Sequence, residues 1–329
     1  MIRIIIDAMG GDKAPYEIVK GCVKALEEKD DFTIKLVGKE EVIKDILKGF
    51  SYNEKRIQIV NANQIIGYDD MPTKAIKSKK ESSMVKGFYM LKEGEGEAFI
   101  SAGNTGALLA GSLLIIGRIE NIIRPAIAAF IPAWKKNVLL VDAGLNSSCR
   151  PESYSQFAVF GKEYYRKLKG IENPTIGLLN IGSEDSKGTK ELKEAFRLLK
   201  KQKINFIGNI EGNDISEGKI DIVLCDGFTG NIILKYLEGT GTFFFNSIKE
   251  MMTGVKGKIS GMFLKNKLYK FKKSIDPDVQ AGAPILGINK LVLKSHGSSN
   301  SISIKNVVLK AVLLSEKKVV MGLKQIFEV

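Results

Sequence analysis

The chain has 329 residues, of which 44% are hydrophobic, and its formal net charge is +13 at pH 7. This length suffices for one large α/β domain or two ordinary ones, and the apolar fraction is typical of globular proteins. Three widely spaced cysteines and a single histidine argue against a disulfide framework or a Cys/His metal site, and they favour a reducing cytosol. The excess of lysine points to an anionic partner, unless it is spread as a solvated surface.

The opening residues, MIRIIIDAMGG, predict a strand, because they lack the longer apolar core and the cleavage site of a secretory signal. We therefore expect a cytoplasmic protein. Further along, only 11 residues, Ala107 to Gly117, run without a charge before Arg118. A membrane-spanning helix needs about 20 apolar residues. This stretch is therefore predicted to be a buried helix that follows a glycine loop.

Short apolar runs alternate with amphipathic helical patterns along most of the chain. The predicted strands are Ile2–Ile6, Phe32–Val37, Ala98–Ile100, Ala126–Phe130, Val138–Val141, Thr175–Leu179, Ile204–Ile207, Ile220–Leu224 and Leu291–Leu293. The predicted helices are Pro15–Lys29, Thr73–Lys92, Pro151–Lys169 and Thr189–Lys201. This alternation predicts a three-layer α/β/α fold, with a mostly parallel sheet covered on both faces. Since no linker divides the chain, we expect one domain over residues 1–329, with two subdomains around a cleft as the open alternative.

Glycine and small polar residues follow several predicted strands. The motifs are DAMGGDKAP from Asp7, SAGNTG from Ser101, DAGLN from Asp142, LNIGSEDSKGT from Leu179 and CDGFTGN from Cys225. In open α/β sheets, ligands bind beyond the carboxyl ends of the strands. Glycine lets a backbone approach a ligand closely, and a helix N-terminus attracts phosphate. Several such loops in one chain favour a shared anion site over a series of ordinary capped turns.

These loops do not carry a nucleotide signature. Neither AMGGD nor AGNTGA has the G-x-G-x-x-G spacing, and GSEDSKGT places Lys187 before its glycine, unlike a P-loop. Lys187, Ser183 and the start of a helix still suit a phosphate group. The loop at Gly103 offers the same chemistry, with Thr105 as a candidate helix N-cap.

Few residues in these motifs suit acid–base or nucleophilic chemistry. His296, between a strand and a helix, could protonate a leaving group, although a structural histidine is the commoner outcome. Cys225 could act as a nucleophile, but a cysteine at the end of an apolar strand is more often buried and inert.

One segment concentrates positive charge. Residues 254–275, GVKGKISGMFLKNKLYKFKKSI, contain seven lysines and no acid, interleaved with apolar residues. Such a basic amphipathic pattern suits an anionic membrane surface or an acidic protein, whereas no nucleic-acid recognition motif accompanies it. A helix that packs its apolar stripe on the body of the protein is the alternative. We place a helical arm within residues 240–277.

Eight motifs in order resemble the bacterial phosphate acyltransferase family (PlsX). They are DAMGGDKAP, KSKKESSM, SAGNTGA, GLLNIGSEDSKGT, GNIEGND, DIVLCDGFTGNIILK, GAPILGI and HGSSN, and they span the chain from Asp7 to about Asn300. The resemblance implies a reversible transfer of a long-chain fatty acyl group from acyl-acyl carrier protein to inorganic phosphate. The acyl phosphate product then feeds a membrane glycerol-3-phosphate acyltransferase in phospholipid synthesis.

The resemblance also implies a fold similar to phosphate acetyltransferases and isocitrate/isopropylmalate dehydrogenases, a homodimer, and no metal or nucleotide cofactor. It implies peripheral membrane association through protruding helices. The residues that we expect to contact the membrane or the carrier protein are Met262, Phe263, Leu264, Lys265 and Lys267.

Because a thioester is already activated, phosphate can attack it directly, and the site must bind phosphate and stabilise the oxyanion. The residues expected to act in catalysis are Lys187, Asn104, Asn180, Asn231 and His296. Lys187 would neutralise phosphate, the asparagines would donate to the oxyanion, and His296 would protonate the thiolate. The residues expected to contact phosphate are Gly10, Gly11, Ser101, Gly103, Thr105, Ser183 and Gly227. Asp7, Asp142 and Asp226 are expected to orient loops.

Three alternatives remain open at this point. A phosphate acetyltransferase that acts on a short acyl-coenzyme A would share the phosphate chemistry but not need the amphipathic arm. A dehydrogenase of the isocitrate type would need a nucleotide. A non-enzymatic basic module that binds lipid or nucleic acid would explain the charge, but not the many loops at strand ends.

Overall fold

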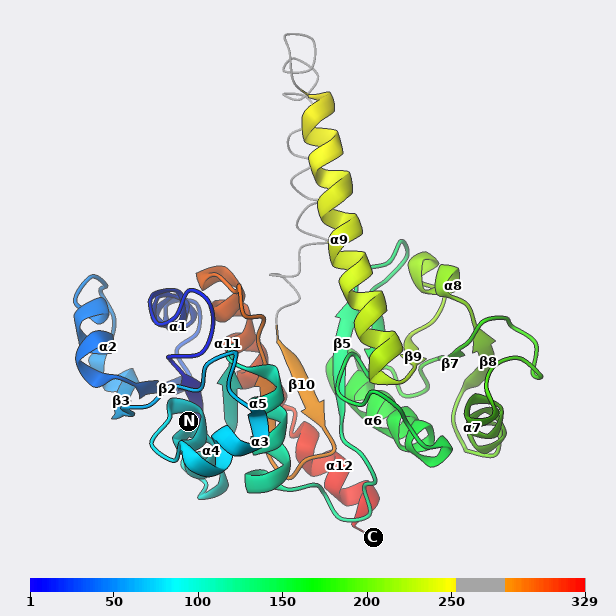
Figure 1. Ribbon diagram of the computed structural model, residues 1–329, viewed down its shortest axis with the longest axis horizontal. Coiled ribbons are helices and arrows are strands. Elements are labelled where there is room, and N and C mark those ends of the chain that lie inside the picture. Colours follow the sequence, from blue (N-terminus) through cyan, green and yellow to red (C-terminus); the bar gives the residue numbers. More distant parts are fainter. Residues whose placement is uncertain (253–281, 329) are drawn as a thin grey trace.

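The computed structural model describes residues 1–252 and 282–328, and the strands within them form one 11-stranded sheet (Figure 1). Its spatial order is β3-β2-β1-β4-β11-β10-β5-β6-β9-β7-β8. The strands are β1 (Ile2–Asp7), β2 (Phe32–Gly38), β3 (Ile57–Asn61), β4 (Ala98–Ser101), β5 (Ala126–Ile131), β6 (Val138–Val141), β7 (Ile176–Leu179), β8 (Phe206–Ile210), β9 (Ile222–Leu224), β10 (Ala283–Leu286) and β11 (Leu291–Lys294).

The sheet reverses its direction near its centre. The pairings β11–β10, β10–β5 and β5–β6 are antiparallel, and the pairings on either side of them are parallel. Strands β1, β2, β3, β4 and β11 therefore run one way, while β6, β7, β8 and β9 run the other way. The prediction of a mostly parallel sheet is confirmed, but its two halves point their carboxyl ends toward opposite edges.

Helices cover both faces of the sheet, as the sequence predicts. They are α1 (Tyr16–Glu28), α2 (Glu40–Leu47), α3 (Pro72–Ser78), α4 (Ser83–Lys92), α5 (Thr105–Gly111), α6 (Pro151–Lys169), α7 (Lys190–Lys200), α8 (Gly212–Glu217), α9 (Gly227–Met251), α11 (Ser301–Glu316) and α12 (Val319–Phe327). Side chains alternate between the faces of each strand. Ile4 and Ile6 enter the core beneath α1 and α11, whereas Ile5 enters the core beneath α4.

Two strands were missed by the sequence patterns, and each has a physical reason. Strand β3 forms an edge of the sheet, and its Gln58 and Asn61 face solvent, so it lacks an unbroken apolar run. Strand β10 contains Pro284, which normally argues against a central strand because proline cannot donate to the ladder. Strand β8 begins two residues later than the start predicted at Ile204.

The helix predicted over Thr73–Lys92 is two helices. Ser82 lies between α3 and α4, and its hydroxyl accepts a hydrogen bond from the Val85 N–H at 3.3 Å. An N-cap of this kind begins a new helix, which the continuous apolar period concealed. The segment Ala107 to Gly117 is a buried helix in part: α5 continues into a π-helical turn, Ser112–Ile116, while Leu114 remains exposed.

Helix α9 is 25 residues long and extends beyond the rest of the fold (Figure 1). It starts between the two halves of the sheet, and its first turns pack Ile233, Leu234 and Leu237 against the core. The helical arm that we place within residues 240–277 coincides with the outer part of α9 up to Met251, and its remainder lies outside the described residues. Among the described helices, none combines the length and apolarity that crossing a bilayer requires.

Gly87 in α4 permits close packing against the sheet, since a β-carbon there would lie 2.3 Å from Cε2 of the buried Phe99. We expect Gly87→Ala to lower the free energy of unfolding by about 1–3 kcal/mol, despite the better helix propensity of alanine. Urea denaturation measures this change. Gly239→Ala in α9 is the matched control, because nothing lies within 4 Å of its built β-carbon. Equal losses in the two variants would contradict this account.

Candidate active site

The strand-end motifs fall into groups at opposite edges of the sheet, and helix α9 lies between them (Figure 1). The loops after β1, β4 and β11 share one edge. The loops after β6, β7 and β9 share the other. All the motifs would lie at one edge only in a sheet whose strands all run the same way.

At the first edge, Asp7 organises the glycine loops. Its carboxylate accepts hydrogen bonds from the Ser101 hydroxyl at 2.7 Å and from the Met9 N–H at 3.1 Å, and Ser101 in turn accepts from the Gly103 N–H at 3.0 Å. Burial raises the pKa of Asp7, while these hydrogen bonds oppose that shift. A β-carbon on Gly10 would lie 2.7 Å from the Gly103 nitrogen, so the two loops touch through their backbones.

The loop after β11 contacts the loop after β1. Asp12 donates its N–H to the Gly297 carbonyl at 2.8 Å, and Gly11 adopts a φ of +116°, which favours glycine. Tyr68 stands over this junction, where a β-carbon on Gly297 would lie 2.7 Å from its hydroxyl oxygen. Burial, with Asp12 nearby, raises the pKa of Tyr68 to about 12.

The side chain of Asn104 is fully used by backbone partners on two loops. Its Oδ1 accepts from the Ala107 N–H at 3.0 Å and caps α5, so Asn104 rather than Thr105 is the N-cap. Its Nδ2 donates to the carbonyls of Gly67 and Tyr68 at 2.9 and 3.1 Å. Asn104 therefore ties the loop before α3 to the loop after β4, and this geometry argues against its expected role as an oxyanion donor.

At the second edge, Asp142 is buried and surrounded by N–H groups. It accepts from the backbones of Ile127, Gly144, Leu145 and Asn146 at 2.8–3.1 Å, and from the Asn146 amide at 2.8 Å. Burial raises the pKa of Asp142, and these donors oppose the shift. Its oxygens are thus occupied in shaping the loop, which fits the orienting role expected for it.

Cys225 does not have the surroundings of a nucleophile. The thiol is 2% exposed, and its Sγ lies 3.4 Å from the Asp142 carbonyl oxygen, to which it donates. Burial, together with the nearby acids Asp142 and Asp226, raises the pKa of the Cys225 thiol well above its usual value. Because the thiolate is the reactive form, we assign Cys225 a packing role.

The start of α9 is held tightly against the loop after β6. Asp226 caps the helix by accepting the Thr229 N–H at 2.7 Å, and the Gly227 N–H donates to the Asn146 carbonyl at 2.7 Å. A β-carbon on Gly230 would lie 1.9 Å from the Asp142 carbonyl oxygen, so no larger residue fits there. Asn231 follows, exposed to solvent and adjacent to Gly144.

The loop between β7 and α7 closes on itself through Asn180. Its Oδ1 accepts from the Ile181 N–H at 2.9 Å, and its Nδ2 donates to the Lys187 carbonyl at 3.1 Å. Asn180 therefore shapes the loop. The side chains of Ser183 and Lys187 are exposed, and the Lys187 Nζ lies 3.6 Å from a Glu184 carboxylate oxygen. Lys187 is thus presented to solvent from a loop of defined shape.

Helix α9 connects the two edges. Asn231, beside the loop after β6, lies one helical turn before Lys235, whose Nζ is 3.1 Å from Nε2 of His296 and 2.7 Å from a Glu238 oxygen. Together with Thr242, these three α9 residues form what we call the polar stripe of α9. Sequence reasoning missed Lys235, although its spacing from Asn231 within DGFTGNIILK places both side chains on one helix face.

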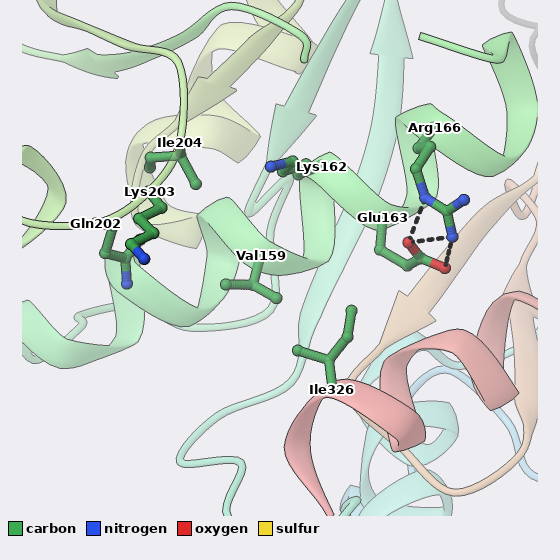
Figure 2. A pocket seen from close by; sticks show the side chains of 8 residues that line it. All are labelled: Val159, Lys162, Glu163, Arg166, Gln202, Lys203, Ile204 and Ile326. Atoms are coloured by element: carbon green, nitrogen blue, oxygen red, sulfur yellow. Dashed lines mark hydrogen bonds and ion pairs between the residues drawn. The ribbon is translucent and has the colours of Figure 1, made fainter. Parts of the chain in front are cut away.

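The pocket in Figure 2 lies apart from these groups. It encloses about 390 Å³ and is lined by Val159, Lys162, Glu163, Arg166, Gln202, Lys203, Ile204 and Ile326, from α6, the turn after α7, and α12. Arg166 and Glu163 are neighbours on α6 and form an ion pair at 2.8 Å. Since none of the lining residues belongs to a strand-end motif, we assign the pocket no part in this site.

The expected membrane or carrier contacts, residues 262–265 and Lys267, lie outside the described residues. Groups of acids, cysteines and histidine that could hold a metal ion are absent from the described ranges 1–252 and 282–328.

Residues 2–321 match the model of a family described as "Fatty acid synthesis protein". The chain is 50% identical over 325 residues to a phosphate acyltransferase of Acetivibrio thermocellus, covering 98% of this chain and 96% of that one. It is 44% identical over 325 residues to a phosphate acyltransferase of Clostridium tetani, covering 98% and 97% of the two chains.

Two solved structures share the fold at low sequence identity. A phosphotransacetylase from Streptococcus pyogenes superimposes with a TM-score of 0.61 at 15% identity, covering 96% of this chain and 94% of that one. A branched-chain phosphotransacylase from Enterococcus faecalis gives a TM-score of 0.60 at 16% identity, covering 96% and 99%. The expected phosphotransacetylase-like fold is confirmed. With a family match over nearly its whole length and close relatives of one kind, this chain belongs to the phosphate acyltransferase family and is an acyltransferase.

Proposed function

We propose that this protein transfers a long-chain fatty acyl group, reversibly, from acyl-acyl carrier protein to inorganic phosphate. The acyl phosphate would supply phospholipid synthesis. Membership of the phosphate acyltransferase family supports the acceptor. The long-chain acyl group in the proposal rests on one observation, which is that two adjacent faces of α9 differ in polarity. Beside its polar stripe, α9 exposes Phe228, Ile232, Tyr236 and Phe243, by 63%, 52%, 72% and 65%, and we call these the apolar stripe of α9.

The two stripes of α9 match the two ends of an acyl phosphate. Lys235 and Asn231 offer donors to phosphate oxygens, and the neighbouring Phe228 and Ile232 offer apolar surface to a fatty chain. Monomeric proteins rarely expose contiguous apolar surface of this kind without a binding role. A substrate that is anionic at one end and apolar along its length explains why both surfaces occur together.

Direct attack needs no enzyme nucleophile. A phosphate oxygen attacks the thioester carbonyl carbon, the tetrahedral oxyanion collapses, the C–S bond breaks, and the carrier thiolate takes a proton. The leaving thiol has a pKa near 8.5 by analogy with cysteine, so it needs little acid assistance. The inert surroundings of Cys225 are compatible with this route, whereas a thioesterase that uses Cys225 would need an accessible thiolate.

For the residue roles, we retain Lys187 and Asn231 as groups that act on phosphate and the oxyanion, because both side chains are exposed. We reassign Asn104 to loop shaping because its amide nitrogen and oxygen both bind backbone partners on other residues. Asn180 is given the same role because its amide joins the two ends of its own loop. The backbone N–H groups in the loops after β1 and β4, including those of Gly11 and Thr105, remain proposed contacts to phosphate. The reaction as written requires no metal or nucleotide.

Four partners follow from this proposal. The acidic carrier protein complements the net charge of +13. A second copy of the chain would cover part of the apolar stripe of α9 in a homodimer. An anionic membrane would attract the lysines of residues 254–275, each contributing about 1 kcal/mol near the surface. The membrane glycerol-3-phosphate acyltransferase would consume the product. The protein would then be cytoplasmic and peripherally membrane-associated.

The proposal is tested by thiol release from palmitoyl-acyl carrier protein, with and without inorganic phosphate, followed by mass spectrometry of the product. We expect release that depends on phosphate and yields palmitoyl phosphate. Release without phosphate would indicate a thioesterase instead. Faster turnover with acetyl-coenzyme A than with the palmitoyl carrier would favour a phosphate acetyltransferase.

Lys187→Ala should lower kcat/KM in this assay by about 100-fold, the usual effect of removing one group that stabilises a developing oxyanion. Lys193→Ala is the control, since Lys193 is an exposed lysine on the neighbouring helix α7, outside the strand-end loop. If both variants kept full turnover, Lys187 would have no part in the reaction.

Membrane binding is tested by co-sedimentation with vesicles that contain anionic lipid. Replacing Phe263 and Leu264 by glutamate should release the protein into the supernatant, because the substitution removes apolar contacts and adds negative charge. Replacing Trp134 and Ile171, which are 88% and 43% exposed, by glutamate leaves residues 254–275 intact and serves as the control. Unchanged binding of the Phe263/Leu264 variant would show that this segment is not the anchor.

A further inference from the structure

Lys235 is held in place by two acceptors on different elements. Its Nζ lies 2.7 Å from a Glu238 carboxylate oxygen, one turn further along α9, and 3.1 Å from Nε2 of His296, just beyond β11. An ammonium group has three N–H donors and no acceptor. Two of its donors are therefore directed by the protein, which leaves one for another group.

The ring of His296 lies between Lys235 and Ser298. Because Lys235 can only donate, its contact with Nε2 needs the lone pair of that nitrogen, while Nδ1 lies 2.8 Å from the Ser298 hydroxyl oxygen and 3.2 Å from the Ser298 backbone nitrogen. Partial burial lowers the pKa of His296, and the neighbouring Lys235 and Lys294 lower it further. The nearby acids Glu238 and Asp12 oppose that shift without reversing it.

A second lysine reinforces the positive charge. Lys294 is the last residue of β11, and burial followed by repulsion from Lys235 lowers its pKa, with Glu238 opposing. Across residues 1–252 and 282–328, no carboxylate forms an ion pair with Lys294. Glu238, which forms an ion pair with Lys235, also offsets part of the positive charge at Lys294. Half-buried positive charge of this kind is stabilised when an anion binds.

We propose that Lys235 and Lys294 bind a phosphate group, and that His296 is a positioning residue that holds the Lys235 ammonium instead of protonating the departing thiolate. The inference rests on the proposed function for the origin of that phosphate. Inorganic phosphate is one source, and the phosphodiester of the carrier's prosthetic group is the other. In both cases the recognised chemistry is a phosphate oxyanion.

Direct binding tests the lysine pair without turnover. Isothermal titration with inorganic phosphate, at constant ionic strength, compares the wild type with Lys235→Met and Lys294→Met. We expect each substitution to weaken binding by about 10-fold or more, as for loss of a charge-assisted hydrogen bond. Lys249→Met, at the far end of the same helix, is the control and should bind as the wild type does. Equal binding by all four proteins would overturn inorganic phosphate as the ligand.

Steady-state kinetics distinguish the two sources. A selective rise in KM for phosphate in Lys235→Met supports inorganic phosphate, whereas a selective rise in KM for the acyl carrier supports the phosphodiester. Partial recovery in Lys235→Arg shows that the charge is what matters. Unchanged KM values for both substrates would overturn the site. If the wild type makes no acyl phosphate, the proposed function fails, but the titration still tests the lysine pair.

The positioning role of His296 has its own test. Glutamine retains an acceptor near the place of Nε2, whereas leucine has none, so His296→Gln should keep turnover within about 3-fold while His296→Leu falls as Lys235→Met does. The pH profile of kcat should keep its shape in His296→Gln. If glutamine and leucine caused equal loss, and the glutamine variant lost a limb of the pH profile, His296 would be the acid.

Discussion

The rest of the site depends on how closely the start of α9 lies against the loop after β6. Gly230 sits where a β-carbon would be 1.9 Å from the Asp142 carbonyl oxygen, so only glycine permits this approach. Asp142 in turn holds that loop with a set of backbone N–H groups. From this contact α9 runs out between the two halves of the sheet, and it brings Asn231 and Lys235 to the places where they meet the other loops.

The polar residues of the strand-end motifs divide into two kinds. Asn104, Asn180 and Asp142 have partners for their donors or acceptors inside the fold, so they determine loop shape. Lys187 and Asn231 present their side chains to solvent, and Lys235 keeps one donor unused by its two partners. A buried polar group must be satisfied internally, whereas a group that binds a ligand must keep some capacity for it. This distinction separates candidate ligand-binding residues from loop-shaping residues, which residue type alone cannot do.

Much of the fold was predictable because local patterns carry it. Continuous apolar runs such as Val138–Val141 and Leu291–Leu293 are buried on both faces, and they are strands in the structure. Strand β10 was missed because Pro284 conflicts with the usual rule for central strands, and its place between β11 and β5 is a long-range property. The three successive antiparallel pairings β11–β10, β10–β5 and β5–β6 reverse the direction of the strands, and no local sequence pattern indicates this reversal.

The sequence by itself determined the family, the three-layer architecture and the loops that carry the chemistry, because those depend on motifs and on hydrophobic period. Only the tertiary structure decided which loop residues keep N–H donors available to bind a ligand. Hydrogen-bond satisfaction depends on partners far away in the chain: Asn104 on the carbonyl of Gly67, and His296 on Lys235. It also decided that α9 contacts the loop after β6 through Asn231 and the loop after β11 through Lys235, since strand direction is set by pairing across the whole sheet.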